Sequence, residues 1–282
     1  MLTDQIASFI DSHPNWSTNT IDRYRRALLL FAAAHPDPSA LKAHDLRLWF
    51  DSHGWGSSAR YIAYQAIRQF LRWQYGAHHP ALTLKLKRKD SPPGRVLDME
   101  RAQALMAIHD TSTPKGWRDL AIISLMLDTG MRCSEVCSLQ LKRLDLRQCH
   151  LDVIVKGGAW SPRVFSDHTA SYLEAWLQHR PKVAAPDCPT VFCSIGGNTP
   201  GQRLTRNGMI CIFRYWGERV GFHVSPHDLR RTMASLSLKA GAPDDIVMKA
   251  GGWHDPEVFR RYTVGVTQED FRRWFPVSEA MK

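Results

Sequence analysis

Several features that would restrict the function are missing from this sequence of 282 residues. It has no run of about 18 apolar residues, the length that a membrane-spanning helix needs, and no internal repeat or low-complexity tract. The opening stretch, MLTDQIASFIDSHPNW, carries acidic residues where a secretory signal needs basic ones. We therefore expect a soluble cytoplasmic protein that acts without a membrane.

Cysteine pairs at the spacing of a metal or redox site are also missing. The chain has six cysteines, but none forms the C-x-x-C pair that zinc sites and thioredoxin-like redox sites use. Since secretion is not expected, disulfides are not predicted either. We expect buried, reduced thiols, and neither a metal ion nor another cofactor.

What the chain does have is a core-forming composition and a strong positive charge. Hydrophobic residues make up 44% of it, and its length allows two domains. The formal net charge is +10. Residues 1–90 hold 12 basic and 7 acidic side chains and residues 91–282 hold 25 and 20, so each part carries +5. A polyanion held by both parts fits this charge, although the excess could also serve solubility alone.

The first part, residues 1–83, is expected to be a domain of four helices. Apolar residues recur at helical spacing within residues 2–10, 21–35, 40–53 and 57–76. Ser57 and Ser58 are predicted to cap the last of these helices, and Gly76 is predicted to end it. Three arginines lie on its polar face, either as solvated residues or as contacts to the polyanion: Arg60, Arg68 and Arg72.

Residues 84–95, LKLKRKDSPPGR, are predicted to be an extended basic linker. The two prolines and the glycine cannot continue a helix. Four positive charges within five residues are more than a plain connection needs, so we expect the polyanion to pass beneath them. These four residues are Lys85, Lys87, Arg88 and Lys89.

Residues 96–282 are expected to form a second, mainly helical domain with a small antiparallel sheet. Helices are predicted after Asp98, over residues 116–130 and over residues 131–140. The period then changes to alternation at Leu151 and Val153, and a glycine pair follows, so residues 150–165 are predicted to form a β-hairpin. The remaining segments again show helical spacing.

Six side chains of the second part stand where packing alone does not require them. One arginine follows a Thr-Gly turn between two apolar helices, and a lysine stands beside the hairpin turn. A histidine and an arginine three residues apart share a helix face, and a tryptophan after a double glycine precedes a tyrosine by nine residues. Each has an ordinary structural explanation, but together they supply the chemical groups that one reaction requires. They are Arg132, Lys156, His227, Arg230, Trp253 and Tyr262.

That reaction is attack on a phosphodiester. Two guanidinium groups can hold the nonbridging oxygens and offset the charge that builds at phosphorus. A phenol has an ordinary pKa near 10, so a nearby histidine would help it to lose its proton. A lysine can protonate the departing oxygen, and a covalent phosphotyrosine keeps the bond energy for religation.

The tyrosine itself is predicted to end a short helix. Asp255 can cap this helix and Pro256 suits its first position. Val258, Phe259 and Tyr262 fall on one face, so the first two are expected to anchor the helix in the core. A core role for the phenol of Tyr262 itself is the ordinary alternative.

In order and spacing, these residues resemble the tyrosine recombinases, the phage integrase family. The matching stretches are TGMRCSEVCSLQ, the hairpin with its lysine, SPHDLRRT, the Gly-Gly-Trp sequence and EVFRRY. Order and spacing match over residues 98–265. Residues 1–88 resemble the family's helical core-binding (SAM-like) domain through weaker signals. The similarity covers nearly the whole chain.

The resemblance implies a mainly α, two-domain fold whose domains form a C-shaped clamp around duplex DNA, with the linker crossing it. It implies that Tyr262 is the nucleophile that forms a 3′-phosphotyrosyl bond, and that Lys156 is the general acid. The other implied roles are phosphate binding by Arg132 and Arg230, proton transfer by His227 and support by Glu135.

The position of Trp253 departs from many family members, which carry histidine there, although others carry tryptophan. An indole N–H can donate to a phosphate oxygen but cannot shuttle a proton. His254 is adjacent, and a shift of one residue would give it this role. We prefer Trp253 because it keeps the usual distance to the tyrosine.

The resemblance also implies partners. The aromatic tail, about residues 267–282, is expected to be a helix that docks in a neighbouring protomer of a tetramer on paired DNA sites, although docking on its own domain is the alternative. An accessory directionality protein is a further possible partner. The helical part begins at once, so no arm-binding domain is expected.

We expect an integrase of a phage or mobile element, and a chromosome-dimer resolvase of the Xer type is the alternative role. The tryptophan variant and the GGAWSPR turn favour the integrase. The residues are also compatible with two other classes of protein. A small type IB topoisomerase would use nearly the same side chains, and a DNA-binding protein without catalysis could keep the fold.

Overall fold

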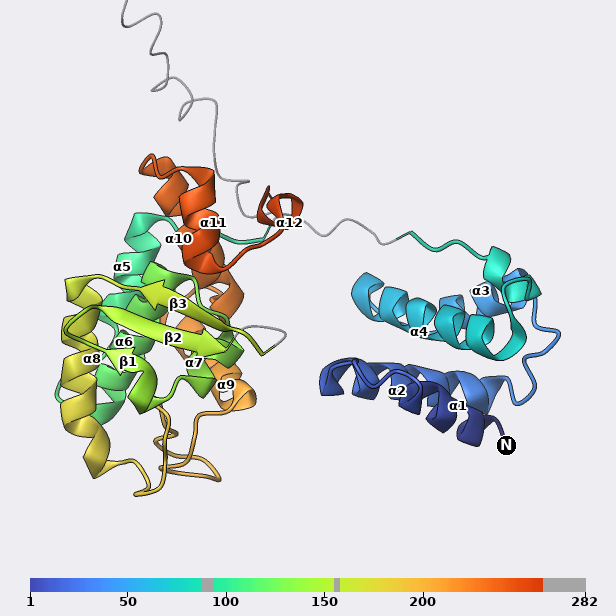
Figure 1. Cartoon of the computed structure of the whole chain (residues 1–282), viewed down its shortest axis with the longest axis horizontal. Coiled ribbons are helices and arrows are strands. Elements are labelled where there is room, and N and C mark those ends of the chain that lie inside the picture. The colour runs from blue at the N-terminus through green and yellow to red at the C-terminus, as the bar shows by residue number, and fades with distance from the viewer. Residues whose placement is uncertain (88–93, 155–157, 261–282) are drawn as a thin grey trace, which may run out of the picture. The chain divides into compact units, whose positions relative to one another are not determined.

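The computed structural model describes residues 1–87, 94–154 and 158–260 (Figure 1). The chain divides into two compact units, Met1–Ser91 and Pro92–Lys282. The expectation of a mainly helical chain with a small antiparallel sheet is confirmed. Within the described residues, no helix is both long and apolar enough to cross a membrane.

The described part of the first unit, residues 1–87, has four helices and a final turn. In chain order they are α1 (Leu2–Asp11), α2 (Thr18–Ala34), α3 (Ala43–Ser52), α4 (Ser57–Tyr75) and the 3-10 helix η1 (Pro80–Thr83). Helix α2 packs against both α1 and α4. Phe31, Phe50 and Phe70 are fully buried and lie in one hydrophobic core, so this unit has a core of its own.

The ends of α4 match the sequence signals in part. Gly76 ends the helix with a positive φ of 85°, as predicted, because that conformation is open mainly to glycine. The predicted cap is wrong by one residue. Gly56 occupies the N-cap position and Ser57 is already helical, so neither serine can accept there as a capping residue.

Residues 84–86 lie on the first unit. The Leu84 side chain is 3% exposed, and its carbonyl oxygen accepts a hydrogen bond from the hydroxyl of Tyr64 at 2.8 Å. Leu86 packs against the same core. The start of the predicted linker is therefore bound to the helical unit, with Lys85 and Lys87 exposed beside it.

The second unit surrounds one long apolar helix, α6 (Pro114–Thr129). Thr113 caps this helix and Pro114 takes its first position. It packs against α8 (Asp167–His179), α10 (Pro226–Lys239) and β3 (Trp160–Val164). Because it is covered on all sides, its residues are apolar around most of its circumference. Its end therefore stands at a fixed place inside the unit.

A three-stranded antiparallel sheet and shorter helices complete this unit (Figure 1). The strands run in the order β1 (Leu144–Asp145), β2 (His150–Ile154) and β3, with Leu151 opposite Arg163. The predicted hairpin is confirmed, whereas the two-residue β1 was not predicted. Among residues 94–154 and 158–260, the structure also has α5 (Met99–Ala107), α7 (Cys133–Ser138), η2 (Leu141–Arg143), η3 (Arg180–Lys182), α9 (Arg206–Val220), α11 (Asp244–Gly251) and α12 (Pro256–Arg260).

The cysteines are free thiols, but not all are buried. Cys137, Cys188 and Cys193 are buried, whereas Cys211 is exposed on α9, so the expectation of burial is wrong for that residue. Among the described residues, no group of three or more His, Cys, Asp or Glu side chains is placed to hold a metal ion.

Candidate active site

Arg132 stands at the start of α7, directly after the end of α6. Gly130 ends α6 in the left-handed conformation, with φ of 59°. The Arg132 backbone N–H donates to Glu135 at 2.8 Å, and its guanidinium donates to the other carboxylate oxygen at 2.7 Å. Glu135 is buried, while the Arg132 side chain is 45% exposed. The carboxylate thus fixes a cation that still reaches the surface.

Arg230 is the second guanidinium of the site, and it is buried at 2% exposure. Its helix α10 is capped by Ser225, whose hydroxyl accepts from the backbone N–H of Asp228. One guanidinium nitrogen donates to the carbonyl oxygens of Gly130 and, at 2.7 Å, of Gly251. Arg230 therefore ties the end of α6 to the end of α11.

Trp253 forms the platform under Arg230. The guanidinium carbon lies 3.8 Å from the centroid of the indole, a cation–π contact. A Cβ atom at Gly251 would overlap the indole ring, which explains why glycine precedes the turn. Phe259 lies edge-on to Trp253 at 5.2 Å between ring centroids. His254, in contrast, is exposed.

His227 lies one turn before Arg230 on the same helix and keeps an exposed edge. Its pKa is lowered from 6.5, first by partial burial and then by the positive charges of Arg231 and Arg230, while Asp228 opposes the shift. Arg132 also lowers it, so both guanidiniums of the site act on this ring. At neutral pH the imidazole is therefore mainly uncharged and able to accept a proton.

Helix α12 begins as the sequence predicts. The carboxylate of Asp255 accepts from the backbone N–H groups of Glu257 at 2.8 Å and Val258 at 3.3 Å. Phe259 anchors the helix at 2% exposure, but Val258 is 38% exposed, so its predicted anchoring role is wrong. Adjacent helical residues point in different directions, and only one of the two faces the core.

Not all of the predicted site lies within the described residues. Lys156, Tyr262 and the tail at residues 267–282 fall outside them, as do Arg88 and Lys89. The structure brings the other predicted residues of the second unit together around the junction of α6, α7, α10 and α11. These are Arg132, Glu135, His227, Arg230 and Trp253.

The predicted contacts of the first unit lie mainly on α4. Arg68 and Arg72 are exposed. Arg60 forms an ion pair with Asp51 and lies over the Phe50 ring at 5.8 Å. Part of the Arg60 charge is therefore already balanced within the unit. On α4, Arg68 and Arg72 are more available to contact DNA.

Sequence reasoning missed a third arginine at the site, Arg163 on β3. It is 2% exposed, and one terminal nitrogen donates to Ser161 at 2.6 Å and to the carbonyl of Pro162 at 2.8 Å. A Cβ atom at Gly252 would overlap its guanidinium. Burial lowers its pKa, and the nearby carboxylate of Glu135 opposes that shift. The sequence did contain one signal for Arg163, because the alternation of the hairpin places this residue on the inward face.

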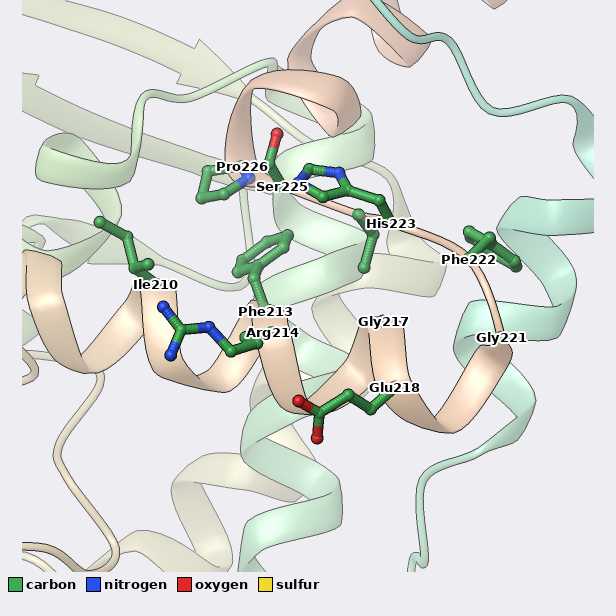
Figure 2. Close-up of a pocket in the computed structure, with 11 residues that line it drawn as sticks. Ile210, Phe213, Arg214, Gly217, Glu218, Gly221, Phe222, His223, Ser225 and Pro226 are labelled. Carbon is green, nitrogen blue, oxygen red and sulfur yellow. The ribbon is translucent and has the colours of Figure 1, made fainter. Parts of the chain in front are cut away.

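An apolar groove of about 530 Å³ borders this cluster. Figure 2 shows Arg214 on α9 on one side of the Phe213 ring, with Ser225 and Pro226 on the other. The last two residues directly precede His227. The groove therefore runs from an exposed arginine to the start of the helix that carries His227 and Arg230.

Comparison with known proteins decides the family. The model of the phage integrase family matches residues 95–268. The chain belongs to the phage integrase family. The tyrosine recombinase XerC of Pseudomonas aeruginosa is 32% identical over 275 residues, which cover 92% of this chain and 88% of that protein. The tyrosine recombinase XerD of Listeria innocua is 28% identical over 280 residues, 93% of either chain.

Solved structures of two other proteins share the fold. A XerH site-specific recombinase bound to palindromic difH substrate, in a post-cleavage complex, matches with a TM-score of 0.76 and 17% identity, over 96% of this chain and 83% of that one. The Tn1549 transposon integrase in complex with transposon right end DNA matches with a TM-score of 0.76 and 16% identity, over 96% and 97%. The expected enzyme class, tyrosine site-specific recombinase, is confirmed at the level of the family.

Proposed function

We propose that this recombinase cleaves and rejoins duplex DNA through a 3′-phosphotyrosyl intermediate at Tyr262. The observation that carries the proposal is the cluster of Arg132, Arg230 and a mainly uncharged His227. Two guanidiniums beside a proton acceptor are what attack on a phosphate diester requires. The order of these residues in the chain is that of the family.

The proposed first step is in-line attack by the Tyr262 oxygen on phosphorus. The phenol proton leaves toward His227, the bond from phosphorus to the 5′ oxygen breaks, and Lys156 protonates that oxygen. Arg132 and Arg230 hold the nonbridging oxygens throughout. Attack by a 5′-hydroxyl on the phosphotyrosine reverses the step and requires neither metal nor nucleotide.

Two further residues support this arrangement. Glu135 fixes Arg132 from within the core, and Trp253 holds the face of Arg230. Because Trp253 stacks on Arg230, we assign Trp253 rather than His254 to the position that holds histidine in many family members. We propose His254 only as an exposed supporting residue.

The proposed partner is duplex DNA. It would be held by the core-binding domain, residues 1–83, by the catalytic domain, residues 96–282, and by the linker between them, residues 84–95. The equal charge of +5 on residues 1–90 and 91–282 supports this, as do the related folds solved on DNA. We further propose a C-shaped clamp, a tetramer on paired sites with the tail of residues 267–282 exchanged between protomers, and an accessory directionality protein. The proposed DNA contacts are Arg60, Arg68, Arg72, Lys85, Lys87, Arg88 and Lys89.

The experiment that tests the reaction uses a suicide substrate with a nick beside the cleavage position. Loss of the short strand prevents religation, so the wild-type protein should accumulate on the DNA 3′ end. Peptide mapping should place the adduct on Tyr262. DNA binding without any adduct would support a DNA-binding protein without catalysis, and relaxation of plasmid without sequence preference would support a type IB topoisomerase.

The biological role has two candidates. We propose integration of a phage or mobile element, which the tryptophan at position 253 and the GGAWSPR turn favour. Chromosome-dimer resolution is the second candidate, and the matches to XerD and XerC over nearly their whole length favour it. Mapping covalent cleavage sites across the source genome separates the two. An integrase should cleave at the ends of an element, and a resolvase at one chromosomal site.

Arg214 is expected to contact a DNA phosphate, because it is exposed at a groove that ends beside His227. Replacing it by alanine should weaken binding evenly across sequences and reduce the slope of log affinity against log salt by about 1. Glu218→Gln, in the same groove, is the matched control and should not weaken binding. An unchanged salt slope for Arg214→Ala would remove this residue from the interface.

His227 is expected to titrate below its ordinary pKa of 6.5. A lowered pKa keeps the ring neutral as the pH falls through 6.5, so cleavage should stay level down to that pH and decline only below it. NMR titration of the ring should give a midpoint under 6.5. Arg231→Gln should move the midpoint upward, since it removes a positive neighbour. A wild-type midpoint at or above 6.5 would contradict the expectation.

A further inference from the structure

We propose that Arg163 is a positioning residue for the general-acid step, because it holds the β2–β3 hairpin against the Gly252 turn. The inference rests on the proposed recombinase reaction. It starts from a feature that the reaction as described does not use, namely a third guanidinium, more deeply buried than Arg132, in the same cluster.

The bonding of Arg163 is incomplete within the described residues. One terminal nitrogen donates to Ser161 and Pro162 of its own strand. Nε and the other terminal nitrogen are buried, and no described residue accepts a hydrogen bond from them. A buried cation with unmade hydrogen bonds opposes folding, and an apolar side chain would avoid that cost. A role for the guanidinium in the site would explain why the cost is tolerated.

Direct contact with DNA is not that role. The two nitrogen atoms for which the described residues supply no acceptor are buried, and Gly252 lies against the guanidinium. Arg132 and Arg230 already supply two cations for one phosphate. Arg163 therefore acts through what it touches.

Arg163 contacts both the hairpin that carries the proposed general acid and the turn beside the proposed phosphate site. Arg163 faces Leu151 across the hairpin, and the last pair of that ladder is Ile154 with Trp160. Lys156, the proposed general acid, follows Ile154 by two residues. The guanidinium also meets Gly252, directly before the indole that holds Arg230. One side chain thus sets the hairpin against the backbone of the phosphate site.

Gly252 is the complementary half of this contact. Its φ is 68°, and any side chain at this position would displace the guanidinium. Gly221, at the end of α9, has a similar φ of 76°, but a Cβ atom added there would meet no other atom within 4 Å. Alanine imposes the same backbone strain at both glycines, but only at Gly252 does it press on Arg163. The two substitutions form a matched pair.

The test compares two suicide substrates, one ordinary and one with sulfur in place of the 5′ bridging oxygen. Sulfur departs without protonation, so it removes the need for a general acid. Arg163→Met should slow ordinary cleavage by about 100-fold, the effect of misplacing a catalytic group. Most of that loss should be recovered on the sulfur substrate, as for Lys156→Met. Gly252→Ala should show the same pattern, and Gly221→Ala neither loss nor recovery.

A purely structural role would slow both substrates equally, and that result overturns the inference. Wild-type speed of Arg163→Met on the ordinary substrate would do so too. If Arg163→Met does not fold, as judged by thermal unfolding, the pair Gly252→Ala and Gly221→Ala decides. Absence of a wild-type adduct on either substrate would instead defeat the proposed reaction, so the two failures are distinguishable.

Discussion

Tyr262→Phe is expected to abolish covalent attachment to a nicked substrate and to leave DNA affinity unchanged. The substitution removes only the phenolic oxygen, which is the atom proposed to bond to phosphorus. No other group can replace a lost nucleophile in a transesterification, so adduct formation should fall by at least about 10⁴-fold. Denaturing gels of the trapped complex give the first quantity, and equilibrium binding to the same DNA gives the second.

Tyr215 supplies the control. It is exposed on α9, and its pKa is lowered by a hydrogen bond from Arg219 and by the charge of Lys115. A phenol that ionises more readily than usual is a rival nucleophile on chemical grounds. Tyr215→Phe should nevertheless form the adduct at the wild-type rate. If Tyr215→Phe lost the adduct and Tyr262→Phe kept it, the assignment of the nucleophile would be wrong.

The elements that the sequence predicted are those specified by neighbours in the chain. Asp255 and Pro256 start α12 through contacts within one turn, and Gly76 ends α4 through its own backbone conformation. The hairpin of β2 and β3 follows from alternation and a glycine pair. Local physics of this kind needs no knowledge of the fold.

The features that were missed depend on contacts between distant residues. Arg230 is buried because it bonds to carbonyls at positions 130 and 251, and nothing near it in the chain foretells that. Arg163 is significant only because its strand packs on α11. Strand β1 is too short to show a period. Such contacts are set by tertiary packing, which a single sequence read locally does not contain.

Most of the residues that the structure brings together were named from the sequence, but Arg163 and the arrangement of the group were not. Spacing and order identified Arg132, Glu135 and the pair on α10, but not how they are held. The structure adds that Glu135 fixes Arg132 and that Trp253 lies on the face of Arg230. Preorganised cations of this kind need little rearrangement when charge develops on a phosphate. In the proposed reaction, we therefore expect the supporting contacts to affect the rate as well as the stability.

Arg230→Ala is expected to combine the largest losses of rate and stability among the described residues of the site. It removes a proposed phosphate ligand and leaves the carbonyls of Gly130 and Gly251 without their donor. We expect single-turnover cleavage to fall by about 10³-fold. Unfolding free energy should fall by about 3 kcal/mol, since two buried carbonyl oxygens are left without a hydrogen-bond donor. Arg231 is the half-buried neighbour of Arg230 on α10. Arg231→Ala should change the cleavage rate and the free energy of unfolding only a little.

Loss of stability must be separated from loss of phosphate binding, and the substrate can do this. A methylphosphonate at the scissile position removes the charge of one nonbridging oxygen, so the reaction needs one cation less. If Arg230 acts on that charge, the defect of Arg230→Ala should shrink on the methylphosphonate, while its lowered unfolding temperature stays the same. An equal defect on both substrates would mean that Arg230 serves only to hold α6 and α11 together, and the phosphate would then rest on Arg132 alone.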